Sequence, residues 1–202
     1  MKGAAPSNTG TGSGLLVVIS GPSGVGKTTI VRHVRDALGA GLSVSVTTRP
    51  RSDSEVDGVD YHFVNEAEFT HQRDAGALLE WAEYLGQCYG TPRRPVERAI
   101  AEGRIMLLEI DVQGGMQVKR SMPEAFAVFI LPPGEDDLLK RLRNRRREPE
   151  EAIQRRFAKA RSEIAMATDC GLYDAFVVNR DLDAACRETL ALIEQRIAGA
   201  CG

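Results

Sequence analysis

Residues 21–28 read GPSGVGKT and match in full the phosphate-binding pattern G-x-x-x-x-G-K-[ST]. A short, mostly β-branched apolar run at 15–19 precedes the motif, and apolar residues recur at helical spacing after it. Strand, glycine-rich loop and helix therefore follow one another in the order that the motif requires. The predicted loop consists of Gly21, Pro22, Ser23, Gly24, Val25, Gly26, Lys27 and Thr28.

Each part of this motif has a physical role in holding phosphate. The three glycines lack a Cβ, so the backbone can turn sharply and direct consecutive N–H groups at phosphate oxygens, helped by the dipole of the following helix. Lys27 is placed to neutralise β- and γ-phosphate charge, and the Thr28 hydroxyl to bind a Mg²⁺ ion that bridges them. A glycine-rich turn without a ligand would need neither the lysine nor the hydroxyl. The motif therefore predicts a bound phosphate chain with Mg²⁺ as its cofactor.

The order of segments predicts an α/β fold with three layers around a parallel sheet. The candidates for its buried strands are the apolar runs at 15–19, 105–110, 126–131 and 176–178. Between 42 and 90 the pattern changes to short alternating segments, which predicts a small β-rich insertion. An Arg-rich tract lies further along the chain, at 140–147.

Capping residues predict where two of the helices begin. Thr91 and Pro92 form a cap followed by a first-turn proline, for a helix that runs to about Glu102. Asp183 is expected to cap a second helix that ends near Ile197. Helices at these places would cover the faces of the sheet.

Composition narrows the class of protein. The chain has 202 residues, 43% of them hydrophobic, which is enough for a substantial core, and its net charge of −2 argues against a protein whose main task is to bind nucleic acid. Four cysteines without C-x-x-C spacing indicate neither a zinc site nor a redox dithiol, so a reduced, cytoplasmic setting is expected. The first 13 residues lack the apolar region of a secretory signal, and no run approaches the roughly 20 residues of a membrane-spanning helix.

Acidic residues end one of the predicted strands. Ile105 to Leu108 runs into Glu109-Ile110-Asp111. Ligands of open α/β sheets bind beyond the carboxyl ends of the strands, and side-chain alternation puts Glu109 and Asp111 on the same side. Asp111 is thus placed to orient magnesium-bound water or a substrate base. The alternative is an ordinary polar strand terminus.

Four further segments lie in a fixed order along the chain: SVTTR at 45–49, EVDGVDY at 55–61, EWAE at 80–83 and YGT at 89–91. Together with GPSGVGKT and EIDVQGG they resemble guanylate kinase, over nearly all of 14–197. The resemblance implies phosphorylation of GMP, and of dGMP, by ATP, on a fold with a nucleotide core, a GMP-binding insertion and a mobile lid. It divides 14–199 into a core (14–41, 91–134 and 165–199), the insertion (42–90) and the lid (135–164). The first 13 residues, rich in Gly, Ser, Thr and Ala, are expected to form a disordered tail.

The resemblance also assigns residues to GMP. Guanine presents adjacent N–H donors at N1 and N2, and both can be accepted by the two oxygens of the Glu80 carboxylate, whereas adenine has a bare acceptor at N1. The residues that match the family's other GMP contacts are Ser45 and Thr91 at the base, Arg49, Tyr61 and Tyr89 at the phosphate, and Glu109 and Asp111 beside them. Taken singly, these residues have ordinary roles open to them in packing, in turns or as surface charges.

The insertion departs from the family pattern at one arginine. Members usually read TTR-x-PR, whereas here Arg49 runs directly into Pro50 and Arg51. Spacing from Arg49 to Tyr61 is kept, so Ser52 stands at the position of the family's second arginine. For Arg51 to bind the GMP phosphate, this loop must rearrange.

The Arg-rich tract resembles the lid that closes over the triphosphate. Arg141, Arg145 and Arg156 fall on lid positions, where arginines stabilise the charge of the transition state and exclude water; with Lys27 and Arg49 they form the expected catalytic set. A solvated helix face and a polynucleotide contact are the alternatives, although no aromatic residues interleave the arginines. Asn179 resembles the family's contact on the adenine side, and is otherwise a turn residue at the end of a strand.

The expected partners are therefore ATP and GMP, with no nucleic acid and no membrane, and the sequence leaves monomer or homodimer open. Three other functions remain: a related kinase for another small acceptor, a non-catalytic protein-interaction module, and a nucleic-acid-binding ATPase. The guanine-reading residues Ser45, Glu80 and Thr91 argue against the first, and Lys27 against the second. The third predicts strongly salt-dependent binding to polynucleotide.

Overall fold

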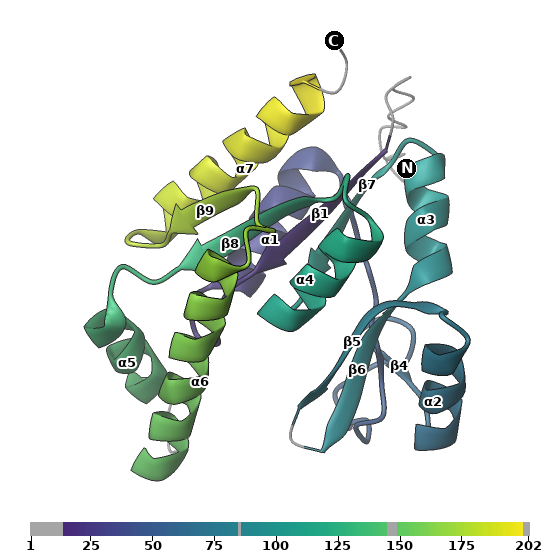
Figure 1. The fold of residues 1–202 in the computed structure, drawn as a ribbon, viewed down its shortest axis with the longest axis horizontal. Coiled ribbons are helices and arrows are strands. Elements are labelled where there is room, and N and C mark those ends of the chain that lie inside the picture. Colours follow the sequence, from purple (N-terminus) through teal and green to yellow (C-terminus); the bar gives the residue numbers. More distant parts are fainter. Residues whose placement is uncertain (1–13, 85, 145–148, 200–202) are drawn as a thin grey trace, which may run out of the picture.

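The structure, a computed structural model, describes residues 14–84, 86–144 and 149–199. Its centre is a parallel sheet of five strands, with helices on both faces (Figure 1). In spatial order the strands are β2 (Gly41–Leu42), β7 (Ile105–Glu109), β1 (Leu15–Ser20), β8 (Phe126–Leu131) and β9 (Ala175–Val178). The predicted α/β fold with a parallel central sheet is confirmed, and the expected tail at 1–13 lies outside the described residues.

Alternation along the strands builds two apolar layers. In β1, Val17 and Ile19 pack on the side of helices α1 (Lys27–Leu38) and α7 (Leu182–Gly199). Leu16 and Val18 pack on the other side, with α3 (Arg93–Ala101) and α4 (Val112–Ser121). Because both faces of the central strand are covered, it consists almost entirely of apolar residues.

The insertion is a small second sheet with a helix of its own. The strand order is β4 (His62–Phe63), β3 (Val46–Thr47), β6 (Gln87–Pro92) and β5 (Leu78–Tyr84). Helix α2 (Glu66–Asp74), capped by the side chain of Asn65, contributes Phe69 to a core shared with Val46 and Leu78. The alternating pattern at 42–90 did not predict this helix, whose sequence has only this one buried apolar residue.

A register shift in β5 places the side chains of three successive residues, 78–80, in three different environments. Leu78 pairs with Pro92 and Glu80 with Thr91, so Leu79 is the extra residue of a β-bulge. Leu78 lies in the core of the small sheet, Leu79 packs in the main core, and Glu80 is buried at the cleft described below. The bulge thus joins the two cores at the residue next to Glu80.

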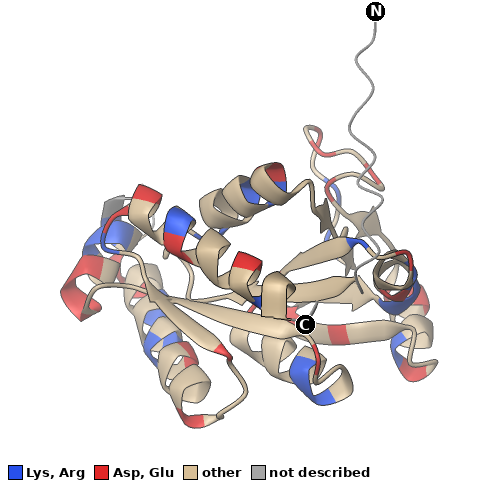
Figure 2. Cartoon of the chain, turned by 90° about the horizontal axis from the view of Figure 1, so that it is seen from above, with Lys and Arg blue, Asp and Glu red and all other residues tan. Residues whose placement is uncertain are grey.

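The segment expected to form the lid, called the lid below, contains helices α5 (Glu135–Asn144) and α6 (Glu150–Asp169), which pack through Leu138, Leu142, Ile153 and Ala160. The lid and the small sheet extend on the same side of the main sheet (Figure 1). Basic and acidic residues are mixed over the helices in Figure 2, and ion pairs join Arg143 to Glu150 and Arg161 to Glu135. None of the helices in the described part of the chain is long and apolar enough to cross a membrane.

Two expected helix starts differ from the structure. Thr91 and Pro92 end strand β6, and the helix begins one residue later, at Arg93. Asp181, rather than Asp183, caps α7, since its carboxylate accepts the N–H of Ala184 at 2.8 Å. Both aspartates precede the same apolar pattern, so the prediction of an aspartate cap was correct, but its position was wrong by two residues.

Candidate functional site

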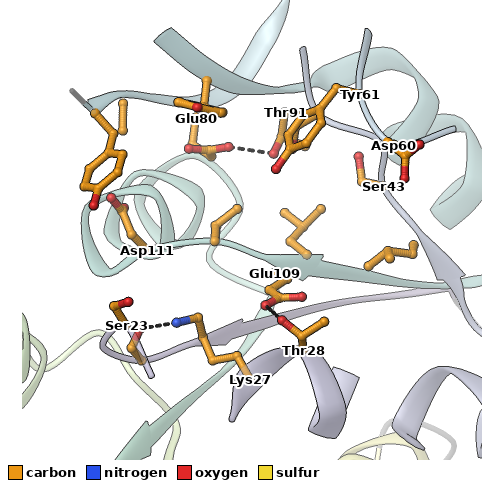
Figure 3. Close-up of a pocket in the computed structure, with 18 of the residues that line it drawn as sticks. Ser23, Lys27, Thr28, Ser43, Asp60, Tyr61, Glu80, Thr91, Glu109 and Asp111 are labelled. Carbon is orange, nitrogen blue, oxygen red and sulfur yellow. Dashed lines mark hydrogen bonds between the residues drawn. The ribbon is translucent and has the colours of Figure 1, made fainter. Parts of the chain in front are cut away.

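A cleft of about 720 Å³ lies between the phosphate-loop end of the main sheet, the small sheet and the lid. Figure 3 shows Glu80, Thr91 and Tyr61 on one side of it and Ser23, Lys27 and Thr28 on the other. Of the residues predicted from sequence, the cleft is lined by Gly21, Ser23, Lys27, Thr28, Ser45, Tyr61, Glu80, Tyr89, Thr91, Glu109, Asp111 and Arg156.

The phosphate loop connects β1 to α1, and its lysine folds back over it. The Lys27 ammonium donates to the carbonyl oxygens of Gly21, at 2.6 Å, and Pro22, at 3.1 Å. Gly26, which immediately precedes α1, has φ of +100°, and a Cβ there would lie 2.8 Å from the Asn179 amide nitrogen. Only glycine combines that left-handed backbone with such a close neighbour.

The carboxyl end of β7 meets the start of α1. The Thr28 hydroxyl donates to Glu109 Oε1 at 2.7 Å, which holds that hydroxyl at the cleft. Asp111 caps α4, with its Oδ1 accepting the N–H of Gly114 at 2.9 Å, while also lining the cleft. The described residues contain no cluster of three or more Asp, Glu, His or Cys that could hold a metal by themselves. These oxygen groups fit Mg²⁺ that is bound mainly by phosphates, with Thr28 as its protein ligand.

Glu80 is a buried acid at the far end of the cleft. It is only 5% exposed, and the fully buried Thr91 donates its hydroxyl to Glu80 Oε1 at 2.6 Å. Burial raises the pKa of Glu80 to about 7, while the Thr91 hydrogen bond acts in the opposite direction. A carboxylate placed this deep is costly unless a ligand supplies further donors.

Arg49 is held by the carboxylate of Glu55. Glu55 forms a bidentate pair with it, at 2.6 and 3.0 Å, and the guanidinium lies 5.4 Å from the centroid of the Tyr61 ring. The hydrogen bond from Arg49, followed by those from Ser52, lowers the pKa of Glu55 to about 2. The two donor sites of the Arg49 guanidinium are thus occupied by a pair of anionic oxygens, and two oxygens of a phosphate could occupy them in the same bidentate manner.

Arg51 lies in the same loop, but its side chain bonds to the loop backbone. Its guanidinium donates to the carbonyl oxygen of Glu55 at 2.7 Å, and the hydroxyl of Ser52 donates to the Glu55 carboxylate, also at 2.7 Å. Neither Arg49 nor Arg51 is among the residues that line the cleft. Arg49 nevertheless lies next to the cleft, because its partners Glu55 and Tyr61 both line it.

Two lid arginines contact the core near the phosphate loop. Arg156 donates to the Ser23 hydroxyl at 2.8 Å, and Arg141 to the carbonyl oxygen of Asn179 at 2.9 Å. Arg145 lies outside the described residues. The lid thereby reaches both the loop and the strand end beside it.

Asn179 bonds to the backbone of the phosphate loop. It is 2% exposed, and its side-chain amide donates to the carbonyl oxygen of Val25 at 2.7 Å. Its Oδ1 is buried without a hydrogen-bond partner in the structure. This placement makes Asn179 a neighbour of the loop backbone, away from the residues that line the cleft.

Comparison with known proteins agrees with this arrangement. The family model described as "Guanylate kinase" matches residues 13–196. The chain belongs to the guanylate kinase family. It is 49% identical over 195 residues to a protein named guanylate kinase from Chelativorans sp., covering 96% of this chain and 88% of that one. It is 51% identical over 171 residues to one from Thermosynechococcus vestitus, covering 84% and 88%.

A solved guanylate kinase has the same fold. The crystal structure of guanylate kinase from Anaplasma phagocytophilum superimposes with a TM-score of 0.71 at 29% identity, covering 92% of this chain and 87% of that chain. Sequence and fold therefore support the same family.

The guanylate kinase site also includes residues that sequence reasoning missed. Lys159 and Glu163 of α6 line the cleft, as do Asp60 and Ser43. The two lid residues could have been found by helical spacing, since they follow Arg156 at intervals of three and four residues on one helix face. Burial raises the pKa of Glu163, while the charge of Lys159 lowers it.

Proposed function

We propose that this guanylate kinase transfers the γ-phosphoryl group of ATP to GMP, giving ADP and GDP, and that it accepts dGMP, which carries the same base and phosphate. The observation that carries the proposal is the position of Glu80. A buried carboxylate lies at one end of a cleft whose other end is a complete phosphate loop. GMP would bind with its base at the first end, and ATP with its triphosphate at the second. The phosphate of GMP and the γ-phosphate of ATP would then lie close together between the two ends.

The base end is suited to guanine. With Thr91 donating to one oxygen, the Glu80 carboxylate has further acceptor sites for the N1 and N2 hydrogens. Adenine would place an acceptor against it and leave the buried charge with Thr91 but without donors from the base, which costs orders of magnitude in affinity. Ser45 lines the same cleft and would bind the base through its hydroxyl.

The acceptor phosphate would lie near the two tyrosines. Tyr61 and Tyr89 line the cleft with ring centroids 6.0 Å apart, and each offers a phenol donor. We propose that Arg49 exchanges Glu55 for the GMP phosphate, and that Arg51 follows with the loop. The bidentate geometry already present in the Arg49–Glu55 pair supports this exchange.

At the donor end, the loop amides and Lys27 would hold the ATP phosphates. Thr28, fixed by Glu109, would be the protein ligand of Mg²⁺, which neutralises phosphate charge when bound. The phosphate of GMP is already ionised near neutral pH, so an oxygen of it attacks without a strong general base. Catalysis then rests on positioning and on the positive charge of Lys27, Arg49, Arg141, Arg145 and Arg156.

The lid would exclude water from the γ-phosphate. Arg156 already bonds Ser23 of the loop, so closure brings a positive charge to the transferred group and removes the competing nucleophile. Asn179 would support the adenine side by fixing the loop backbone. We place the reaction in the cytoplasm, with ATP and GMP as the partners.

The test measures ADP formation from ATP and Mg²⁺ with GMP, dGMP, AMP, UMP or no acceptor. Turnover is expected with GMP and dGMP only, and Lys27→Ala should abolish it because the phosphate charge loses its partner. ATP hydrolysis indifferent to GMP, or stimulated by polynucleotide in a salt-dependent manner, would contradict the proposal.

A further inference from the structure

We propose that two residues of core helix α4, Gln117 and Gly114, are positioning residues for GMP: they hold strand β5, and with it the Glu80 carboxylate, at a fixed place relative to the phosphate loop. The inference rests on the proposed function, because it concerns how the guanine-reading carboxylate is aimed. Neither residue lines the cleft.

Gln117 acts on the backbone of β5. Its amide oxygen accepts the N–H of Trp81 at 3.1 Å, and its amide nitrogen donates to the carbonyl oxygen of Trp81 at 2.8 Å. β5 is an edge strand of the small sheet, so these groups face away from β6. One side chain thereby replaces the missing neighbouring strand, at the residue directly after Glu80.

Gly114 sets the position of the Glu80 carboxylate itself. A Cβ at residue 114 would lie 2.6 Å from Glu80 Oε2 and 3.1 Å from its carboxyl carbon, so a larger residue would displace that group. Thr91 holds the other oxygen, Oε1, at 2.6 Å. The carboxylate is therefore located between a threonine hydroxyl and the bare backbone of a helix.

The start of α4 also lies close in the chain to a residue of the proposed ATP site. α4 begins after its cap, Asp111, which follows Glu109, the acceptor of the Thr28 hydroxyl. The Thr28 contact thus belongs to strand β7, whereas the contacts to Glu80 and Trp81 belong to helix α4, which follows β7 in the chain. Loosening the α4 contacts should weaken GMP binding while leaving ATP binding nearly unchanged.

The first test is Gln117→Ala, with Gln195→Ala as a control for the same change on the exposed face of α7. Loss of two neutral hydrogen bonds should raise the KM for GMP about tenfold. We expect kcat and the KM for ATP to stay within about twofold, and Gln195→Ala to behave as wild type. A KM for GMP that is unchanged in Gln117→Ala would overturn the inference.

Gly114→Ala gives a second test, in which protein stability and GMP binding are expected to change in opposite directions. Alanine favours a helix over glycine, so helix propensity predicts a protein that is at least as stable. Displacement of Glu80 predicts a KM for GMP raised tenfold or more in that folded protein. Wild-type GMP affinity in folded Gly114→Ala would contradict the proposal even if Gln117→Ala failed to fold.

A double-mutant cycle checks that Gln117 acts through Glu80. Once Glu80→Gln has removed the charge, adding Gln117→Ala should change the KM for GMP by less than twofold. Effects that simply multiply would show that Gln117 acts elsewhere. If the wild-type protein itself shows no GMP-dependent ADP formation, the proposed function fails; if wild type is active and the variants match it, only this inference fails.

Discussion

The ammonium group of Lys159 on α6 lies 4.2 Å from the centroid of the Tyr84 ring on β5. Both residues line the cleft, so this contact joins the lid to the small sheet across it. Lys159 also lies 3.6 Å from Glu163 on its own helix. A cation held between a ring and a carboxylate stabilises this contact between the lid and the small sheet.

We expect Lys159→Ala to lower kcat/KM for GMP two- to fivefold, because a partly exposed cation–π contact contributes about 0.5–1 kcal/mol. Lys159→Arg should keep the cation over the ring and retain most of the activity. Arg161→Ala, which removes the exposed pair with Glu135, is the matched control on the same helix. Equal losses in the two alanine variants would show that general lid stability, and not the Tyr84 contact, is responsible.

The affinity for the base should depend on the protonation of Glu80. Its pKa of about 7 means that the carboxyl group gains a proton as pH falls below 7, and a protonated acid cannot accept both guanine N–H groups. Between pH 8 and pH 6 we expect the dissociation constant of guanosine, which has no phosphate to titrate, to rise about tenfold. Titration by NMR would measure it, and a flat profile in wild type, matching that of Glu80→Gln, would contradict the prediction.

The same group should make the ligand-free protein less stable at high pH. The pKa of Glu80 is raised in the folded state, so its contribution to the free energy of unfolding is present below about pH 4.5 and lost as pH rises through about 7. Glu80→Gln should therefore be more stable than wild type by roughly 1–3 kcal/mol at pH 8, with little difference at pH 5. Urea unfolding at both pH values measures this, and a pH-independent difference would rule out the carboxylate as the cause.

Asn179 should matter for stability more than for contact with ATP. Asn179→Ala leaves the carbonyl oxygen of Val25 without its donor and should lower the free energy of unfolding by about 1–3 kcal/mol. Asn179→Asp should cost at least as much, because a carboxylate would face that carbonyl oxygen. Thermal unfolding without nucleotide checks both, and two stable variants with only a raised KM for ATP would assign Asn179 to the ligand instead.

The two arginines of the insertion should differ. Arg49 has bidentate geometry and an aromatic neighbour, whereas Arg51 bonds a backbone carbonyl oxygen. We expect Arg49→Ala to raise the KM for GMP more than a hundredfold, as loss of a charged bidentate contact of about 3 kcal/mol implies, and Arg51→Ala less than tenfold. Steady-state kinetics with GMP varied distinguishes them, and equal losses would show that Arg51 reaches the phosphate after all.

Local patterns were sufficient to predict the main sheet and the phosphate loop. Four of the five strands of that sheet were predicted, because each is an apolar run bounded by polar residues. The fifth, Gly41–Leu42, is only two residues long and leaves no periodic signal. The loop was predictable because its chemistry depends on consecutive residues.

Contacts between distant segments could not be predicted in this way. The pairing of Gln117 with Trp81 joins residues 36 positions apart, and no spacing rule connects a helix side chain to a strand backbone. Likewise, the sequence showed that Arg51 is displaced, but its bond to the Glu55 carbonyl oxygen depends on how the loop folds.

The bulge at Leu79 determines which face of the small sheet carries the Glu80 side chain. Glu80 faces the cleft because one extra residue separates it from the pairing of Leu78 with Pro92. A slip of one residue in the pairing of Glu80 with Thr91 would turn the carboxylate toward the opposite face of the sheet. The base-reading end of the cleft therefore depends on the register of β5 against β6 as well as on the identity of residue 80.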